Sequence, residues 1–334
     1  MERPIESMTT VYYDADASLE PLAASTVAVL GYGNQGRAQA LNLRDSGLEV
    51  VVGNVDDPYA LQAREDGFEP LPLAEATRRA DAVLLLIPDE VQGEVYRRDV
   101  APHLDRGDLL CFAHGYNVAF GHITADAALD VVMVAPRMIG AGVRQRFVDG
   151  RGFPSFVGVH QDATGRAHAR MLAIARAIGS TRAGCLECTF ADEATLDLFT
   201  EQAFGPAMGA AMRAAIETLV EAGFPPEAAL LELYLSGELA YSLEKAAELG
   251  MVAQWELHSH TSQYGSMTRS ARFADLDLKE RMKAILAEIR GGSFAREWQA
   301  EQAAGLPVFK AAKEMMRHHP MVEWEAKAKK AFRR

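Results

Sequence analysis

The sequence predicts an α/β protein with a doubly wound sheet in its N-terminal half and an all-helical C-terminal half. From Ser25 to about Gly184, apolar strand-like runs alternate with helical patterns, which is typical of a parallel sheet covered on both faces. After Gly184 the strand pattern stops, and the chain is almost wholly helical in pattern from Thr189 onward. We therefore expect two domains, at residues 1–183 and 184–334.

The expected strands are short apolar runs, and the expected helices carry apolar residues at helical spacing. Strands are predicted at 26–30, 49–53, 82–87, 108–113, 130–135 and 155–159, with a short last strand near 181–184. Helices are predicted at 37–46, 191–219, 226–249, 278–291 and 293–303. Several C-terminal helices are apolar on more than one face, so neighbouring helices or another subunit must bury them. Because only about 150 residues build this domain, an intertwined dimer is expected.

A glycine-rich turn follows the first strand, in the run Gly31, Tyr32, Gly33, Asn34, Gln35 and Gly36. Gly31 suits a tight turn, Gly33 leaves room for a diphosphate, and Gly36 lets the next helix pack close to the strand. The N–H groups at that helix start would bind the diphosphate of a dinucleotide. The alternative is a purely structural glycine turn in another α/β protein.

Ligands of doubly wound sheets lie beyond the C-terminal ends of the strands. In this chain those positions are Gly31–Gly36, Asn54–Asp57, Pro88-Asp89, His114–Asn117 and Pro136-Arg137. His114 follows a strand at the place where a nicotinamide ring would lie, so it could donate a proton or orient a donor. The alternative is a histidine in a surface loop.

Two acidic pairs in the helical half are candidate metal ligands. Asp197 and Glu201 are four residues apart in an apolar run, which puts both carboxylates on one helix face and suits one or two Mg²⁺. A solvated acidic stripe would give the same spacing. Glu232 and Glu238 are six apart, about 240° around a regular helix, so either one is structural or the helix is distorted near Ser236-Gly237.

Other metal-like patterns have simpler explanations. Cys185 and Cys188 have CxxC spacing, but no second pair accompanies them. His258 and His260 are expected to form local hydrogen bonds. His318-His319 before Pro320 is expected at a helix C-terminus.

The composition excludes several classes of protein. The chain has 334 residues, a net charge of −12 and a pI near 5.3, which argues against a nucleic-acid binder. No apolar stretch approaches membrane-spanning length, and the start carries Glu2, Asp14 and Asp16 without a signal-peptide run. Three cysteines fit a reducing compartment, so we expect a cytoplasmic enzyme without membrane or nucleic-acid partners.

Taken together, these motifs resemble the short form of the ketol-acid reductoisomerases from about Thr10 to Arg334. The stretches that carry the resemblance are Gly31–Gly36 with Ala38–Gly47, Phe112–Asn117, Val134–Arg137, Val159–Ala163, Glu187–Phe190, Asp197–Gln202 and Ser259–Gly265. The resemblance implies a Rossmann domain that binds NAD(P), followed by a knotted, intertwined helical domain. It also implies a homodimer or larger homo-oligomer.

The resemblance also assigns roles to residues. Asp197 would bridge two Mg²⁺, Glu201 would bind one, and His114 would be the active-site histidine. Glu232 and Glu238 would complete the metal site from the partner subunit, with Ser259 holding the substrate carboxylate. Pro88 and Gly140 would contact the cofactor.

Two departures from the family pattern stand out. Arg137, which the resemblance places among the catalytic residues, stands where the family usually has lysine, and Met138-Ile139-Gly140 stands where a glycine-proline-glycine turn is usual. The two glutamates of the second metal helix, which the family spaces by four residues, are here six apart.

The loop after the second strand predicts a preference for NADH over NADPH. Family members that use NADPH usually carry arginine and serine there, whereas this chain has Asn54, Asp56 and Asp57. These side chains can accept hydrogen bonds from a ribose hydroxyl but would repel a 2′-phosphate. Alternatively, Asp56 caps the helix that starts at Pro58 and points away from the cofactor.

The activity that the resemblance implies is Mg²⁺-dependent alkyl migration in a 2-acetolactate-type 2-hydroxy-3-keto acid, followed by reduction to a 2,3-dihydroxy acid in branched-chain amino acid biosynthesis. One alternative is a related reductase of 2-keto acids that has lost the migration step. Another is a cofactor-binding protein without turnover.

Overall fold

The computed structural model describes residues 10–333. The chain divides into two compact units between Leu196 and Asp197, within helix α8 (Phe190–Phe199). Glu2, with the rest of residues 1–9 and 334, lies outside the described residues. The first unit holds the sheet, and the second is built from helices alone.

The first unit is organised around a mixed sheet of eight strands with the order β1-β8-β7-β6-β5-β4-β2-β3. The strands are β1 (Val11–Tyr12), β2 (Thr26–Leu30), β3 (Glu49–Gly53), β4 (Ala82–Leu85), β5 (Leu109–Phe112), β6 (Asp130–Pro136), β7 (Ser155–Gln161) and β8 (Cys185–Glu187). From β3 to β6 the neighbours are parallel, as predicted. The prediction of a parallel sheet is wrong at the other edge, because β7 is antiparallel to β6 and β1 is antiparallel to β8.

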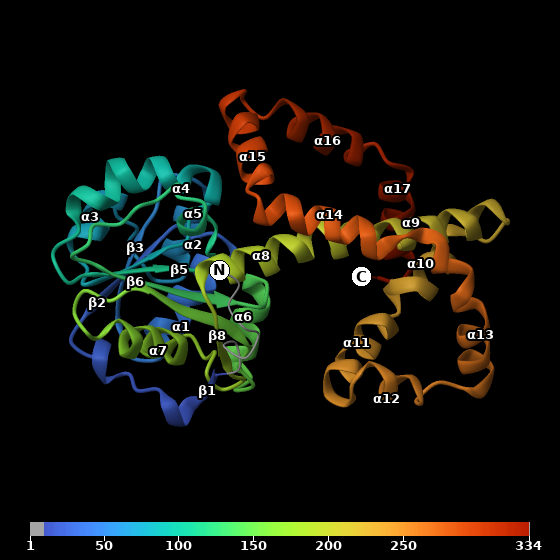
Figure 1. The fold of residues 1–334 in the computed structure, drawn as a ribbon, viewed down its shortest axis with the longest axis horizontal. Helices are drawn as coiled ribbons and strands as arrows, with labels where there is room; N and C mark the ends of the chain where they lie inside the picture. The colour runs from blue at the N-terminus through green and yellow to red at the C-terminus, as the bar shows by residue number, and fades with distance from the viewer. Residues whose placement is uncertain (1–9, 334) are drawn as a thin grey trace. The chain divides into compact units, whose positions relative to one another are not determined.

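Helices cover both faces of this sheet, which explains its apolar strands. Every residue of β4, β5 and β6 is buried. Figure 1 shows α1 (Asn34–Asp45) and α7 (Ala167–Ala177) on one face and α3 (Leu73–Arg78) and α4 (Asp89–Val95) on the other. The shorter helices of this unit are α2 (Pro58–Glu65), α5 (Tyr116–Ala119) and α6 (Gly140–Val148).

The last strand lies just beyond its predicted place. The chain turns at Ser180–Gly184, where the N–H groups of Ala183 and Gly184 donate to the carbonyl of Ser180. Gly184 has a φ of +103°, a conformation that ends the turn and that glycine adopts without strain. The strand therefore begins at Cys185 rather than near 181.

One buried ion pair holds the N-terminal ends of the strands together. Arg170 of α7 donates to Asp130 at the start of β6 at 3.0 Å and to the carbonyls of Asp81 and Gly107 at 2.8 Å. Asp130 also accepts from the N–H groups of Ala163 and Thr164. Because both charges are bonded on several sides, they can be buried without a large penalty.

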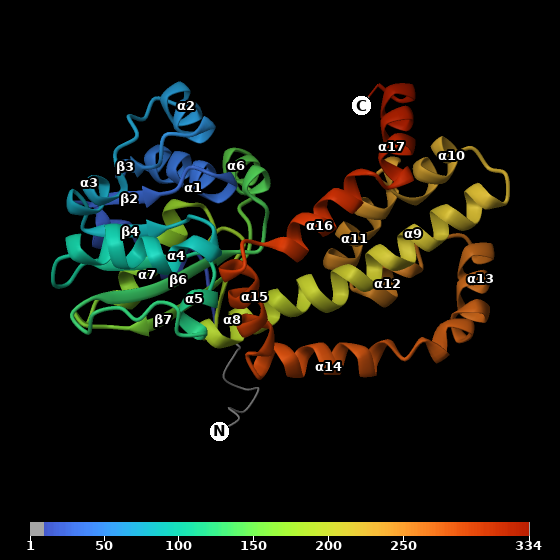
Figure 2. The same ribbon diagram turned by 90° about the horizontal axis from the view of Figure 1, so that it is seen from above.

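The second unit consists of helices around a small apolar core. The helices after α8 are α9 (Gly205–Glu221), α10 (Pro226–Leu230), α11 (Glu238–Leu249), α12 (Met251–Trp255), α13 (His260–Ser270), α14 (Leu278–Arg290), α15 (Ser293–Ala303), α16 (Pro307–Arg317) and α17 (Pro320–Ala331). Figure 2 shows α17 beside α10, and Ile216, Leu230 and Ala328 are fully buried where these helices and α9 pack. No helix among residues 10–333 has the length and apolar character needed to cross a bilayer.

Two long helices predicted for this half are interrupted. The helix predicted at 191–219 contains a π-helical segment at Thr200–Phe204, and the one predicted at 226–249 contains another at Leu231–Leu235. The second helix then breaks at Gly237, whose φ is +88°. The distortion expected near Ser236-Gly237 is therefore confirmed.

Candidate active site

The glycine turn between β2 and α1 is shaped by close backbone contacts. Gly31 has a φ of +93°, and a Cβ there would lie 2.9 Å from the carbonyl oxygen of Leu86. A Cβ on Gly36 would lie only 1.8 Å from the carbonyl oxygen of Gly31. Gly33 differs, because nothing lies within 4 Å of the place that its Cβ would take. The fold therefore requires Gly31 and Gly36, whereas the absence of a side chain at Gly33 leaves open space.

That open space has the features of a diphosphate site. Helix α1 begins at Asn34, directly after Gly33, and the first N–H groups of a helix have no partner within it. A cavity of about 690 Å³ opens here, lined by Tyr32, Gly33, Asn34 and Tyr59 among others. Backbone donors together with the helix dipole would bind an anion at this point.

The start of α6 is packed directly against this turn. A Cβ on Gly140 would lie 1.8 Å from the carbonyl oxygen of Asn34, so only glycine fits. The Gln35 side chain donates to the carbonyl of Met138 at 2.8 Å. Gly140 and Gln35, both predicted to contact the cofactor, thus join the glycine turn to the segment that follows Arg137.

Asn54 and Asp57 form a hydrogen-bonded loop at the end of β3. The Asn54 Oδ1 atom accepts from the N–H of Tyr32 at 2.9 Å, and its amide nitrogen donates to Asp57 at 2.8 Å. Asp57 also accepts from the N–H groups of Tyr59 and Ala60, so it is the N-cap of α2. The suggestion that Asp56 caps this helix is wrong. Asp56 is an exposed side chain next to the cap.

His114 is held at the C-terminal edge of β5. Its Nδ1 atom lies 2.8 Å from Asp89 Oδ2, and the Asn117 amide donates to the other carboxylate oxygen of Asp89 at 3.1 Å. The imidazole stacks on Tyr116 at 5.8 Å between ring centroids. Burial raises the pKa of Tyr116 to about 12, so its phenol is neutral at physiological pH. Pro88, an exposed residue, immediately precedes α4 and its first residue, Asp89.

Glu193 is a buried carboxylate that sequence reasoning missed. It accepts from the N–H of Gly115 at 2.6 Å and from Arg137 Nη2 at 2.8 Å. The Arg137 guanidinium also lies over the Phe156 ring at 5.1 Å from its centroid, and its Nε atom donates to the carbonyl of Ala135. The available signal was the spacing, since Glu193 is four residues before Asp197, as Asp197 is before Glu201.

His114, Glu193 and Asp197 come together around α8. One ligand atom from each lies within 4.8 Å of the others. Only Asp197 of this group belongs to the predicted metal set. Carboxylate oxygens are hard donors that suit Mg²⁺, and the Glu193 carboxylate already binds Arg137 and Gly115. The donor chemistry thus fits Mg²⁺ at Asp197, with Glu201 one turn further along the chain.

The remaining predicted residues belong to the second unit and are exposed. Glu201 and Glu232 each occupy the second position of a π-helical segment, a local geometry common at functional sites. Glu238 is the first residue of α11, after the break at Gly237. Ser259 is the N-cap of α13, where its hydroxyl accepts from the N–H of Ser262 at 3.2 Å.

The cysteine and histidine pairs that resembled metal-binding patterns have local structural roles. Cys185 and Cys188 are buried free thiols, and burial raises the pKa of Cys188 to about 12, which disfavours a thiolate ligand. His258 hydrogen-bonds Gln254 within one turn. His318 ends α16 as predicted, and the side chain of His319 caps the start of α17.

Comparison with known proteins decides the family. Residues 21–184 match the sequence model described as acetohydroxy acid isomeroreductase, NADPH-binding domain, and residues 190–334 match that of the ketol-acid reductoisomerase C-terminal domain. The chain belongs to the ketol-acid reductoisomerase family. It is accordingly an NAD(P)H-dependent oxidoreductase, and the resemblance found in the sequence is confirmed.

Two relatives illustrate the breadth of this family. The ketol-acid reductoisomerase (NADP(+)) of Methanopyrus kandleri is 44% identical over 93% of this chain and 95% of its own. The structure of an NADH-preferring ketol-acid reductoisomerase from an uncultured archean has a TM-score of 0.92 and 38% identity, over 96% of this chain and 99% of that one. The names of the two relatives point to different cofactors.

The open space at Gly33 allows a test of whether the cofactor diphosphate of this ketol-acid reductoisomerase binds there. Gly33→Ala should leave the thermal midpoint unchanged, because its φ of −71° suits alanine and nothing would touch the added methyl. The methyl would stand where a diphosphate must approach, so calorimetric titration should show NAD(P)H affinity falling by about tenfold or more. Gly209→Ala, also with nothing within 4 Å of its Cβ but on α9, is the matched control. Unchanged affinity in Gly33→Ala would place the diphosphate elsewhere.

Proposed function

We propose that this protein is a Mg²⁺-dependent ketol-acid reductoisomerase that acts on 2-acetolactate or a closely similar 2-hydroxy-3-keto acid. The observation that carries the proposal is the grouping of Asp197, Glu193 and His114 around α8, at the edge of the sheet where the strands end. Bound Mg²⁺ would supply a Lewis acid that polarises the substrate ketone and stabilises the alkoxide during alkyl migration. The substrate class and the metal requirement are inferred from the family and from this donor set.

The residues around α8 would divide the remaining work. His114, whose Nδ1 atom lies 2.8 Å from Asp89, would hold a proton at its other ring nitrogen, Nε2. Arg137, fixed by Glu193 and Phe156, would hold a positive charge beside the acids. Asp197 and Glu201 would provide oxygen ligands from one chain.

A site shared between two subunits would bring in the other acids. Under this proposal Glu232, Glu238 and Ser259 come from the partner subunit. Support comes from the apolar side chains that the second unit exposes on its helices, including Tyr241 on α11 and Val308 and Met315 on α16, which are 59%, 70% and 72% exposed. Apolar surface of this kind is usually covered by another protein surface, here a second copy of the chain.

We further propose that NADH is the preferred cofactor. The Asn54–Asp57 loop lies at the end of β3, beside the ribose position expected for a Rossmann domain. Asn54 and Asp57 are engaged in shaping the loop, which leaves Asp56 as the exposed carboxylate that would bind a ribose hydroxyl and repel a 2′-phosphate.

Loss of the migration step is the second candidate. Arg137 in place of lysine and the six-residue spacing of Glu232 and Glu238 favour it. Such a protein would still reduce the migrated keto acid.

An assay with two substrates separates these functions. With Mg²⁺ and NADH, the wild type should consume both 2-acetolactate and 3-hydroxy-3-methyl-2-oxobutanoate, and Asp197→Asn should lose about 10²-fold or more of the turnover of 2-acetolactate. Cofactor binding, measured by titration, should be retained in the variant. Consumption of the second substrate alone would establish the reductase. An Asp197→Asn variant with more than about a tenth of the activity would contradict a metal role for this residue.

Mixing two inactive variants tests the shared site. Refolding Asp197→Asn together with Glu238→Gln should restore part of the activity, because one of the two sites in a hybrid dimer would receive both native halves. Native mass spectrometry would show that hybrids form. Inactive hybrids would mean that each site is built within one chain.

Paired substitutions in the loop test the cofactor choice. Asp56→Ala should raise the ratio of kcat/KM for NADPH to that for NADH by about tenfold, since about 1.4 kcal/mol of repulsion is removed. Asp57→Ala should instead lower stability by about 0.5–2 kcal/mol through loss of the cap. A wild type that favours NADPH, or an unchanged ratio in Asp56→Ala, would contradict the assignment.

A further inference from the structure

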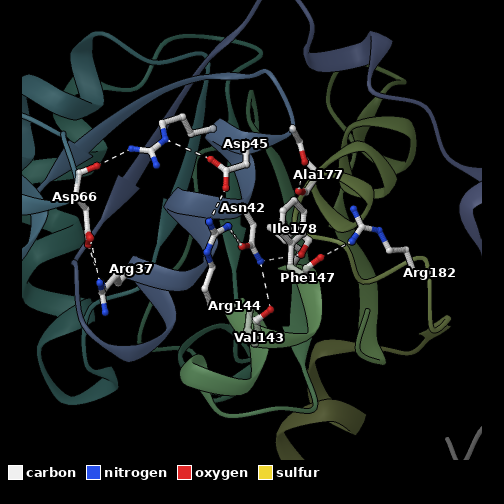
Figure 3. Close-up of polar contacts among 12 residues, drawn as sticks. Arg37, Asn42, Asp45, Asp66, Val143, Arg144, Phe147, Ala177, Ile178 and Arg182 are labelled. Atoms are coloured by element: carbon white, nitrogen blue, oxygen red, sulfur yellow. Dashed lines mark hydrogen bonds and ion pairs between the residues drawn. The ribbon is translucent and has the colours of Figure 1, made fainter. Parts of the chain in front are cut away.

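An arginine on α1 faces the cofactor cavity but is already paired. Arg37 lines the same 690 Å³ cavity as Gly33, Asn34 and Tyr59. Its guanidinium donates two hydrogen bonds to Asp66, from Nε at 2.6 Å and from Nη2 at 3.0 Å. Figure 3 shows this pair, with Asp66 located beyond the end of α2.

Asp66 is held in place from several sides. The hydroxyl of Tyr32, a fully buried residue, donates to Asp66 Oδ2 at 3.0 Å. The Asp66 carbonyl accepts from Arg44 at 2.6 Å, and its N–H donates to the carbonyl of Gln62. The Arg37 side chain is 47% exposed and the Asp66 side chain only 14%. The carboxylate is therefore the fixed member of the pair, and the arginine is the member that can move.

The pair carries no net charge toward the cavity. The bonds from Arg37 and then from Tyr32 lower the pKa of Asp66, so the carboxylate is ionised throughout the neutral range. In a dinucleotide site, an arginine near the end of the second strand accommodates a 2′-phosphate. Arg37 lines the cavity together with Pro58 and Tyr59, which follow the loop at the end of that strand, β3. Here the two charges of Arg37 and Asp66 cancel, and an approaching phosphate would meet a fixed carboxylate as well.

We propose that Asp66 is a cofactor-specificity residue that acts through Arg37, by withholding its guanidinium from the 2′-phosphate of NADPH. The proposal deepens the proposed cofactor preference and rests on the placement of the dinucleotide in this cavity. It is separate from the loop at Asn54–Asp57, because Asp66 discriminates by neutralising a cation and Asp56 by repelling an anion. The two residues lie at opposite ends of α2, with Asp56 before its start and Asp66 after its end.

Asp66→Asn is the variant that tests the proposal. The amide oxygen can still accept from Tyr32, so the substitution removes the charge and keeps the shape. Calorimetric titration should show NADPH binding about fivefold tighter or more, with NADH binding changed by less than about twofold, because the released arginine can pair with a phosphate and NADH has none at this position. The ratio of kcat/KM for the two cofactors should move in the same direction.

Two further variants show whether a change in the NADPH to NADH ratio is caused by the release of Arg37. Asp149→Asn removes an equal charge from an acid that is paired with Arg151 at 2.9 Å and does not line the cavity, and it should leave the NADPH to NADH ratio unchanged. Arg37→Gln combined with Asp66→Asn should return the ratio to the wild-type value. Thermal melts of each variant report folding, and a second substitution, Asp66→Ser, repeats the test if Asp66→Asn does not fold.

The possible results separate this proposal from the proposed function. The role of Asp66 is overturned if the NADPH to NADH ratio stays constant in folded Asp66 variants. It is also overturned if the tighter binding of NADPH persists when Arg37 is removed. Failure of the wild type to bind either cofactor would instead contradict the cavity as the dinucleotide site. A wild type that prefers NADPH would overturn the preference proposed from the loop, while the shift in ratio relative to that wild type would still test Asp66.

Discussion

The candidate site depends on three places where backbone meets backbone with no room for a Cβ. Gly36 touches Gly31, Gly140 touches Asn34, and a Cβ on Gly115 would lie 2.3 Å from the carbonyl oxygen of Phe190. These contacts bring the starts of α1, α6 and α8 against loops at the C-terminal edge of one sheet. Because the N-terminal turn of a helix presents unpaired donors, this packing concentrates anion-binding groups beside the strand ends. These backbone contacts between distant segments, and not closeness in the sequence, bring His114, Arg137 and Glu193 together.

Two fully buried carboxylates mark the two ends of the sheet, and they have different surroundings. Asp130, at the N-terminal end of β6, accepts from the buried Arg170, two backbone N–H groups and the Thr164 hydroxyl. Glu193 accepts from Arg137 and one backbone N–H, next to His114 and Asp197. A buried carboxylate is tolerated when it is paired and hydrogen-bonded. Asp130 lies among strand starts, away from the ligand edge, and is structural, whereas Glu193 positions an arginine and a loop at the ligand edge.

The strands of the first unit could be predicted because burial on both faces gives them continuous apolar runs. The predicted ranges 26–30 and 49–53 are correct at both ends. Strand direction at the far edge could not be predicted, because β7 and β8 have the same apolar pattern whether they run parallel or antiparallel. The two-residue β1 is too short to give any pattern. The sequence offers two adjacent aspartates, Asp56 and Asp57, as the N-cap of α2. Only the hydrogen bonds of Asp57 in the structure identify the cap.

The acids of the second half were harder to predict for a related reason. Residue spacing predicts which side chains share a helix face only while the helix is regular, and π-helical segments interrupt the pattern at Glu201 and Glu232. Glu193 could have been found by extending the four-residue spacing one turn toward the N-terminus. The burial of Glu193 could not be predicted, because the sequence shows only an acid in the first turn of α8. The loop at Gly115 and the side chain of Arg137, which enclose it, come from distant parts of the chain.

The resemblance found in the sequence implies lysine at position 137, and the structure shows how arginine is accommodated there. Lysine would bring one compact charge to this position, whereas arginine brings a planar group that needs a flat contact and in-plane acceptors. The structure supplies both, with the ring of Phe156 at 5.1 Å and the acceptors Glu193 and Ala135. The guanidinium is thereby fixed in one orientation by groups on β6, β7 and α8. Arginine therefore carries the same charge as lysine would but is held differently, because the position of its guanidinium is determined by the same packing that brings α8 to the edge of the sheet.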